Sequence, residues 1–152
     1  MVELRRVRGD SPEARALVAA MEAWIAESFG PQDPDRTSTV GLDEMAPPGG
    51  VFVILYESGE PVAGGGLRRL DEGVAEIKRM FVEPAARGRG FGRRVLLELE
   101  AVAVELGYRR LRLDTAESLT TATALYRSAG YRDIPDYNGN SYASFWGEKV
   151  LA

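Results

Sequence analysis

Three glycines and four arginines are concentrated in a short stretch near the middle of the chain. They are Gly88, Gly90 and Gly92, and Arg87, Arg89, Arg93 and Arg94. Because glycine has no Cβ atom, backbone amides there can approach an anion closely, and the start of a helix adds about half a positive charge. The stretch therefore predicts a pyrophosphate site, for which the arginines supply charged donors. A glycine-rich turn with a solvated basic face is the alternative interpretation.

Two familiar phosphate-binding motifs do not fit this stretch. A P-loop has Lys-Ser or Lys-Thr after its last glycine, whereas Gly92 is followed by Arg93 and Arg94. A dinucleotide fingerprint has the spacing G-x-G-x-x-G in the first strand-to-helix unit, whereas this chain has G-x-G-x-G near its middle. The sequence therefore disfavours both a P-loop nucleotidase and a dinucleotide-binding enzyme.

The chain contains no cysteine and no histidine, which limits the chemistry available to it. These absences exclude a thiolate nucleophile, a Ser-His-Asp triad and an ordinary zinc site. A hard cation held by oxygen ligands is still possible, but there is no EF-hand spacing and no other dedicated acidic cluster, so we expect no metal. Any catalysis must therefore come from carboxylates, Tyr, Lys, Arg, Ser, Thr or backbone amides.

Length and composition predict a single domain over residues 1–152, with 45% hydrophobic and 28% charged residues. No segment approaches the ~18 uninterrupted apolar residues of a membrane span. There is also no basic-then-apolar leader, so we expect a soluble, cytoplasmic protein. The formal net charge of −4 argues against a nucleic-acid partner and favours a small one.

Hydrophobic periodicity and turn residues predict an α/β (α+β) fold with a mixed sheet. The first strands form an antiparallel front, the strand, glycine loop and helix that follow begin a central βαβ unit, and a hairpin ends the chain. Residues 30–50 are predicted to be a long loop with one short helix near 38–45. The other predicted elements are strands at 2–7, 51–57, 61–70, 74–82 and 111–115, helices from 10–13 to Gly30, at 95–106 and at 122–129, and a hairpin turn near 138–139.

Strand 74–82 has an irregular polar pattern. Glu76 and Lys78 are polar on one parity and Arg79 on the other, whereas residues 80–82 are all apolar. Either both faces of the strand are covered at its end, or a bulge shifts its phase.

Two motifs resemble those of the GCN5-related N-acetyltransferases, the GNAT family. Residues 87–92, Arg-Gly-Arg-Gly-Phe-Gly, are similar to the family's pyrophosphate loop, Q/R-x-x-G-x-G/A. Residues 122–131, Ala-Thr-Ala-Leu-Tyr-Arg-Ser-Ala-Gly-Tyr, resemble its second block, A-x-x-L-Y-x-x-x-G-F/Y. The order of the elements also fits, so the resemblance covers nearly the whole chain.

The resemblance implies that acetyl-CoA is the co-substrate and lies in a V-shaped opening between strands 74–82 and 109–114. Its pantetheine would pair with the backbone of the first strand as though it were another strand. The family's pantetheine-contacting Asn corresponds to Leu119, so that contact would be lost or made by Thr120 or Thr121. The implied coenzyme residues are Met80, Phe81, Val82, Arg87, Gly88, Arg89, Gly90, Phe91, Gly92, Arg93, Thr121 and Tyr126.

Glu76 and Tyr126 are the implied catalytic residues. An alkylammonium with a pKa near 10.4 is neutral only about one part in 10³ at pH 7, so the reaction needs a base. Glu76 lies where some family members carry a catalytic Glu, acting directly or through water; otherwise it is a surface carboxylate paired with Lys78, Arg79 or Arg112. Tyr126 has the position of the family's general acid, which protonates the CoA thiolate; otherwise it is a core aromatic. Without a cysteine to hold the acetyl group, we expect direct transfer in a ternary complex.

By the same resemblance, the amine acceptor lies between the first helix with its following loop and the last hairpin. Asp33 and Asp35 would attract a cationic amine there, unless they only solvate the loop. Trp24 is expected in the core. The remaining candidates are Phe29, Tyr137, Asn138 and Tyr142, of which Phe29, Tyr137 and Asn138 are the predicted substrate residues.

Two other functions stay open at this point. A catalytically silent acyl-CoA-binding or sensing module would keep the glycine loop without productive chemistry. A nucleotide-dependent oxidoreductase would require affinity for NAD or NADP, which the glycine spacing does not suggest. A homodimer is a further expectation, because it is common in families that look like this one.

Overall fold

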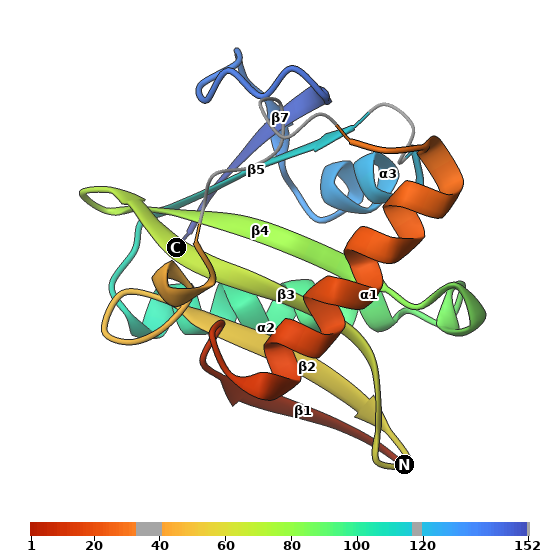
Figure 1. Ribbon diagram of the computed structural model, residues 1–152. Helices are drawn as coiled ribbons and strands as arrows, with labels where there is room; N and C mark the ends of the chain where they lie inside the picture. Colours follow the sequence, from red (N-terminus) through yellow and green to blue (C-terminus); the bar gives the residue numbers. More distant parts are fainter. Residues whose placement is uncertain (33–40, 117–119, 152) are drawn as a thin grey trace.

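The computed structural model describes residues 1–32, 41–116 and 120–151. Within these residues the chain forms a seven-stranded sheet with the order β1-β2-β3-β4-β5-β7-β6 (Figure 1). β4 and β5 are parallel, and the other neighbouring strands are antiparallel. In chain order the elements are β1 (Val2–Val7), α1 (Pro12–Phe29), η1 (Leu42–Glu44), β2 (Val51–Glu57), β3 (Glu60–Asp71), β4 (Val74–Val82), η2 (Pro84–Ala86), α2 (Phe91–Glu105), β5 (Arg110–Ala116), α3 (Thr120–Ser128), β6 (Arg132–Asp133) and β7 (Ala143–Val150).

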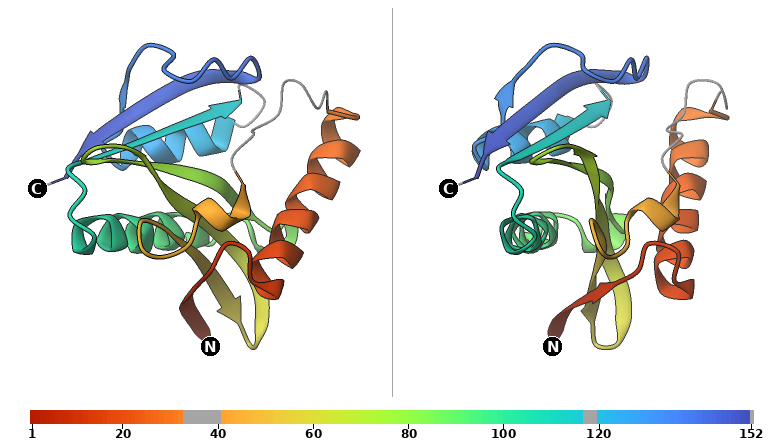
Figure 2. Two further views of the ribbon diagram at one scale, coloured as in Figure 1. Left: turned by 60° about the vertical axis from the view of Figure 1, so that its left-hand side comes forward. Right: turned by 90° about the vertical axis from the view of Figure 1, so that its left-hand side faces the viewer.

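Helices cover both faces of the sheet. α1 and η1 lie on one face, and α2 and α3 lie on the other (Figure 2). The core on the α2 and α3 face includes Leu96, Leu99, Leu111 and Leu113, and the core on the α1 face includes Leu17, Val18, Met45, Phe52 and Phe81. No helix in the described ranges is long and apolar enough to cross a membrane.

The predicted fold class is confirmed. The first, second and fourth strands have the predicted bounds of 2–7, 51–57 and 74–82. β4, α2 and β5 form the predicted central βαβ unit, because β4 and β5 are joined through a helix and pair in parallel. The two periodicities of the sequence, alternation in strands and the 3.6-residue repeat in helices, therefore locate these elements correctly.

Three predicted features differ from the structure by more than one or two residues at the end of an element. Helix α2 begins at Phe91, ahead of the apolar stripe that starts at Val95, because Gly90 takes a left-handed conformation and starts the helix directly. The last hairpin has a two-residue strand β6 and a long connection over 134–142 in place of a tight turn near 138–139. The predicted helix near 38–45 is represented by η1, while Asp33, Asp35, residues 38–40 and Leu119 lie outside the described residues.

A β-bulge explains the irregular pattern of β4. Gly64 pairs with Phe81 and Gly66 with Lys78, so the single residue Gly65 faces two residues of β4. Arg79, one of these two, has a φ of 60°, which is costly for a residue with a side chain. A Cβ atom at Gly65 would lie only 2.5 Å from the Met80 sulfur, so a larger residue there would force the Met80 side chain to move. The extra residue turns Met80 toward the α2 core and Phe81 toward the α1 core, and it confirms the phase shift.

β4 and β5 pair over only a short distance. The parallel register joins Val74 to Arg110, Ala75 to Leu111 and Glu76 to Arg112, and within the described residues the pairing ends there. Beyond this point the two strands diverge (Figures 1 and 2). We call the place beyond Glu76 and Arg112 the fork. The fork leaves one edge of β4, including residues 80–82, without a neighbouring strand in the part of the chain described, as the V-shaped opening requires.

Candidate active site

The glycine loop ends in a helix start that has no side-chain cap. Gly88 and Gly90 have φ values of 79° and 83°, and Gly90 is the N-cap of α2. The first bond of the helix runs from the Arg94 N–H to the Gly90 carbonyl oxygen over 3.2 Å, so the amides of residues 90–93 have no partner within the helix. A Cβ atom at Gly88 or Gly90 would meet no atom within 4 Å. The backbone thus presents unused amides at the positive end of a helix, in a place open to a ligand.

The loop arginines bind protein groups around this helix start. The Arg87 Nε donates to the Val82 carbonyl oxygen over 2.9 Å, and its guanidinium lies 4.2 Å from the centre of the Trp24 ring. Arg93 donates to the Ser128 hydroxyl over 2.5 Å. Arg89 forms an exposed ion pair with Glu57, which holds the pKa of that carboxyl below its usual value. Exposed pairs of this kind are weak, so Arg89 can turn to another anion at little cost.

Tyr126 is buried beside the fork. It is 4% exposed and packs edge-on against Tyr131, with 6.0 Å between the ring centres. Burial, and to a lesser extent the negative charge of Asp114, raises the pKa of the Tyr126 phenol well above its usual value. Tyr126 is therefore part of the core, as one interpretation held, and it also keeps a protonated phenol within electrostatic reach of Asp114. Thr121 is exposed in the first turn of the same helix.

Glu76 is fully buried, which corrects the interpretation of it as a surface carboxylate. Its Oε1 accepts a hydrogen bond from the Arg68 Nε at 2.9 Å, and its Oε2 accepts one from the Tyr137 hydroxyl at 2.5 Å. The ammonium of Lys78 lies 3.4 Å from Oε2. Both carboxylate oxygens are therefore occupied by protein donors. Lys78 is one of the expected partners, whereas Arg112 pairs with Glu148 over 2.9 Å.

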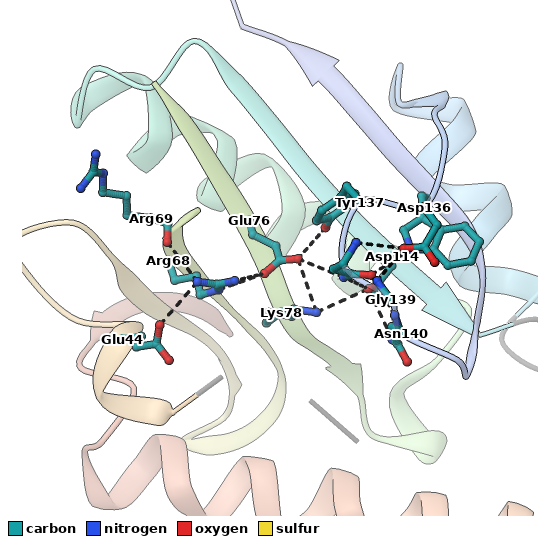
Figure 3. A network of polar contacts seen from close by, with 12 residues as sticks. Glu44, Arg68, Arg69, Glu76, Lys78, Asp114, Asp136, Tyr137, Gly139 and Asn140 are labelled. Carbon is teal, nitrogen blue, oxygen red and sulfur yellow. Dashed lines mark hydrogen bonds and ion pairs between the residues drawn. The ribbon is translucent and has the colours of Figure 1, made fainter. Parts of the chain in front are cut away.

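A second set of polar contacts lies just past the fork (Figure 3). The Lys78 ammonium is 3.5 Å from Asp114 Oδ2, and so it links β4 to β5 where their pairing has ended. The side-chain amides of Asn138 and Asn140 donate to the same oxygen, the latter over 3.3 Å. Burial and the charge of Glu76 raise the pKa of Tyr137 well above its usual value. We call Glu44, Arg68, Glu76, Lys78, Asp114, Tyr137, Asn138 and Asn140 the fork network.

The connection between β6 and β7 is built to reach this network. The Asp136 Oδ1 accepts hydrogen bonds from the backbone N–H groups of Asn138 and Gly139, over 2.9 and 2.7 Å. The Trp146 indole N–H donates to the Asn138 side-chain oxygen over 3.0 Å, which directs the Asn138 amide N–H groups toward Asp114. Local turns therefore replace the predicted tight turn and place Tyr137 and Asn138 at the fork.

Charges alternate across the sheet along one row that passes through Glu76. The strand registers place Arg68 beside Glu76, Glu76 beside Arg112, Arg112 beside Glu148, and Glu148 beside Arg132. Glu148 is 4% exposed, and like Glu76 it is paired with more than one cation. Opposite charges directly across neighbouring strands stabilise a sheet, so this row stabilises the strands that carry the fork network.

The predicted acceptor residues fall into two groups. Tyr137 and Asn138 belong to the fork network. Phe29 lies at the end of α1, 46% exposed, with its ring 5.6 Å from that of Trp24. Trp24 packs 6.0 Å from Phe81, in agreement with a core position. No contact in the described ranges joins Phe29 to the network.

Sequence reasoning missed Asp114 and its contact with Lys78. The only signal is a parity in β5, where Arg112 and Asp114 alternate with the buried Leu111 and Leu113. This alternation predicts that one side of β5 is polar, but it does not predict which residues contact that side. Within the described residues there is no group of three or more carboxylates that could hold a metal ion.

Residues 18–131 match the sequence profile of the Acetyltransferase (GNAT) family. The uncharacterized N-acetyltransferase YjgM of Escherichia coli (strain K12) is 34% identical over 151 residues, which cover 88% of this chain and 89% of that protein. An IAA acetyltransferase of Azospirillum brasilense is 40% identical over 118 residues, or 77% of this chain and 75% of that protein. The PaiA N-acetyltransferase of Thermoplasma acidophilum, solved in complex with coenzyme A, has the same fold, with a TM-score of 0.72, 18% identity and 99% coverage of both chains.

Proposed function

The chain belongs to the GNAT acetyltransferase family, and we propose that it transfers the acetyl group of acetyl-CoA directly to a primary amine. The acceptor is a small molecule, an amino acid or a peptide. The observation that carries this proposal is the uncapped start of α2 next to an unpaired edge of β4. The start of α2 offers amides to a pyrophosphate, and the edge of β4 offers backbone groups to an extended chain. CoA contains a pyrophosphate and an extended pantetheine chain.

The coenzyme would bind along these two features. Its pyrophosphate meets the amides of residues 90–93, and Arg87, Arg89 and Arg93 surround it with positive charge. Its pantetheine lies along residues 80–82 of β4, and its thioester reaches the fork. Thr121, exposed at the start of α3, replaces the contact that Leu119 cannot make. A structural relative is solved with coenzyme A, which supports this arrangement but not the details of the contacts.

Tyr126 supplies the proton for the departing thiolate. Its raised pKa keeps the phenol protonated, so a donor is present whenever the thioester is bound. A thiolate that forms in the same desolvated place also binds a proton more strongly than it would in water. The proton of the incoming ammonium needs an acceptor as well. Glu76 is the prediction from the sequence and from the family resemblance.

A silent acyl-CoA-binding module is the less favoured alternative, because the relatives that span most of the chain are named as N-acetyltransferases or as an acetyltransferase. Turnover distinguishes the two. We would measure release of CoA thiol from acetyl-CoA with a panel of amines that includes putrescine, phenethylamine, glycinamide and an alanine-initiated tripeptide. Binding without turnover across the panel would favour the silent module.

Coenzyme binding is tested separately by thermal shift with acetyl-CoA, CoA, NADPH and ATP. At about 100 times the dissociation constant a ligand stabilises the fold by ~2.7 kcal/mol. We expect acetyl-CoA and CoA to raise the melting temperature by several degrees, and NADPH and ATP to leave it unchanged. A shift with NADPH or ATP alone would reject the coenzyme assignment. An acetylated enzyme trapped in the absence of acceptor would reject direct transfer.

A further inference from the structure

The predicted base has little room to accept a proton. Glu76 is fully buried, and the Arg68 and Tyr137 donors already occupy its two oxygens. To act as a base it would have to take the proton in competition with these donors, in a buried place where the bonds are strong. This argues for a different carboxylate at the fork.

Asp114 is the first residue of β5 beyond the fork on the face that carries Glu76 and Lys78. Its three polar contacts within residues 1–32, 41–116 and 120–151, from Lys78, Asn138 and Asn140, all go to one oxygen, Oδ2. These donors fix the orientation of the carboxylate, and Oδ1 has no contact within the same ranges. Asp114 therefore combines a fixed position with an oxygen that can take a new partner.

Asp114 also lies within electrostatic reach of the proposed acid. Its charge contributes to the raised pKa of Tyr126, a residue of α3, and α3 covers the other face of the sheet. The same charge acts on Tyr137 from the connection between β6 and β7. A thioester at the fork would thus have a protonated phenol and a carboxylate near it, and direct transfer needs a proton donor for the thiolate and an acceptor for the ammonium proton.

The local charge balance favours a cationic guest. In the fork network the carboxylates of Glu44, Glu76 and Asp114 outnumber the cations Arg68 and Lys78 by one. Arg112, the nearest further cation on β5, is engaged by Glu148. An alkylammonium at Asp114 would therefore balance the charge of the network, whereas an anionic group would not.

We propose that Asp114 binds the ammonium of the acceptor through Oδ1 and accepts its proton. Lys78, Asn138 and Asn140 are positioning residues that hold Oδ2, and Glu76 holds Lys78 in place. This inference rests on the proposed acetyltransferase function. It names the base of that reaction and a primary ammonium as the group that the acceptor must carry.

The ammonium gives one proton to Asp114, and the neutral nitrogen attacks the thioester carbon. The tetrahedral intermediate collapses, the carbon–sulfur bond breaks with its electron pair going to sulfur, and Tyr126 protonates the sulfur. The acylated nitrogen then loses its second proton, which restores the Tyr126 phenol. Asp114 releases the first proton to solvent, so the products are an amide, CoA and one proton.

The test is the pH dependence of kcat/KM for Asp114→Asn with the amine that the wild-type protein acetylates fastest. The titratable and charged groups around Asp114 are Glu76 and Lys78 of β4, Asp136 and Tyr137 of the connection between β6 and β7, Tyr126 of α3, and Arg112, two residues earlier on β5 and paired with Glu148. At pH 7 we expect kcat/KM to fall about 10²- to 10⁴-fold. It should recover about tenfold per pH unit toward the pKa of the amine, because solution then supplies the neutral form.

Three measurements keep this test specific. The affinity of Asp114→Asn for acetyl-CoA should be unchanged. Trifluoroethylamine, which is already neutral at pH 7, should lose much less activity than putrescine. In Asp114→Ala, added formate should restore part of the rate by replacing the missing carboxylate. Asp133→Asn, the same change at the exposed Arg127 pair, is the matched control and should behave as wild type.

A wild-type pH profile in Asp114→Asn would overturn the inference while leaving the acetyltransferase assignment intact. The same conclusion follows if a folded Glu76→Gln shows the recovery with pH and Asp114→Asn does not. Absence of turnover by the wild-type protein with every amine would instead reject the proposed function, and the inference with it.

Discussion

The start of α2 and the fork between β4 and β5 both present groups that can bind a charged ligand, but one uses backbone amides and the other uses side chains. At the start of α2 the charge comes from backbone amides, and residues adjacent in sequence set their geometry. At the fork it comes from side chains of β3, β4, β5, η1 and the last connection. The first needs glycines and a helix, whereas the second needs several strand registers to be correct at once.

This difference has an energetic side. Amides at an exposed helix start are solvated when no ligand is bound, so little is lost if the ligand is absent. Buried ions are costly unless each keeps its partners. We therefore expect changes at the helix start to affect mainly coenzyme binding, and changes at the fork to affect both stability and turnover.

The largest effect on stability should follow removal of the Glu76 carboxylate. Glu76→Ala leaves Arg68 without its buried partner and Lys78 with Asp114 alone, so the free energy of unfolding should fall by about 3–5 kcal/mol. Urea unfolding followed by circular dichroism measures this. Glu76→Gln, which keeps the shape, is the comparison and should lose less. A loss below about 1 kcal/mol for Glu76→Ala would remove the energetic contrast between the two regions.

Gly90→Glu should separate ligand binding from folding at the helix start. A carboxylate there would repel the pyrophosphate, and affinity for acetyl-CoA should fall at least about a hundredfold, or ~2.7 kcal/mol. Because Gly90 has a φ of 83°, any side chain also adds backbone strain of about 1–2 kcal/mol. Gly90→Ala carries that strain without the charge and is the control. Calorimetric titration of both variants gives the answer, and equal affinities would mean that the amides do not meet a phosphate.

Tyr126→Phe tests whether the buried phenol acts in the chemical step. We expect kcat to fall about a hundredfold and the affinity for acetyl-CoA to stay within about threefold. Because burial raises the Tyr126 pKa, the wild-type protein should keep its donor protonated and show no loss of rate from this group up to about pH 10. Steady-state rates of both proteins, measured from neutral pH up to that value, provide the comparison. Full activity in the variant would leave Tyr126 with a packing role only.

The smallest effect is expected at the exposed ion pair between Arg89 of the glycine loop and Glu57 of β2. Glu57→Gln frees the Arg89 guanidinium and should strengthen acetyl-CoA binding by about two- to fivefold at low salt. Since Arg89 lowers the pKa of Glu57, the pair adds stability above the unfolded pKa and loses it as pH falls through the folded one. The melting difference between wild type and variant should therefore vanish in acid. Its persistence there would point to a cause other than this charge.

The sequence allows most of the helix start to be predicted, because its determinants are local, although the helix begins at Phe91 and not at the predicted residue 95. Gly88, Gly90 and the apolar stripe after Val95 specify a left-handed loop and a helix without reference to the rest of the chain. The positions of Glu76, Lys78 and Arg79 likewise leave two interpretations of β4, a strand covered on both faces at its end or a strand with a bulge, and the structure has the bulge.

The fork could be predicted only in part, because its contacts join residues far apart in the sequence. Arg68 meets Glu76 through the β3 and β4 register, and Asn140 meets Asp114 through turns that Asp136 holds. Nothing in the sequence around Asp114 indicates that β4 and β5 no longer pair at this position. Tyr137 and Asn138 were predicted through the family resemblance. The contact between Asp114 and Lys78 could be found only from the pairing of β4 with β5.

The bulge in β4 also determines how this strand can change over evolution. Before Arg79 the strand directs Glu76 and Lys78 toward the fork network, and after it the strand directs Phe81 to the α1 core and Met80 to the α2 core. A deletion of one residue here would exchange Met80 and Phe81 between two cores of different shape, yet leave the charged pair untouched. The extra residue therefore separates the polar half of the strand from its apolar half. Under the proposed function, substitutions that adapt the polar half to a new acceptor would need no compensation in the half proposed to hold the coenzyme.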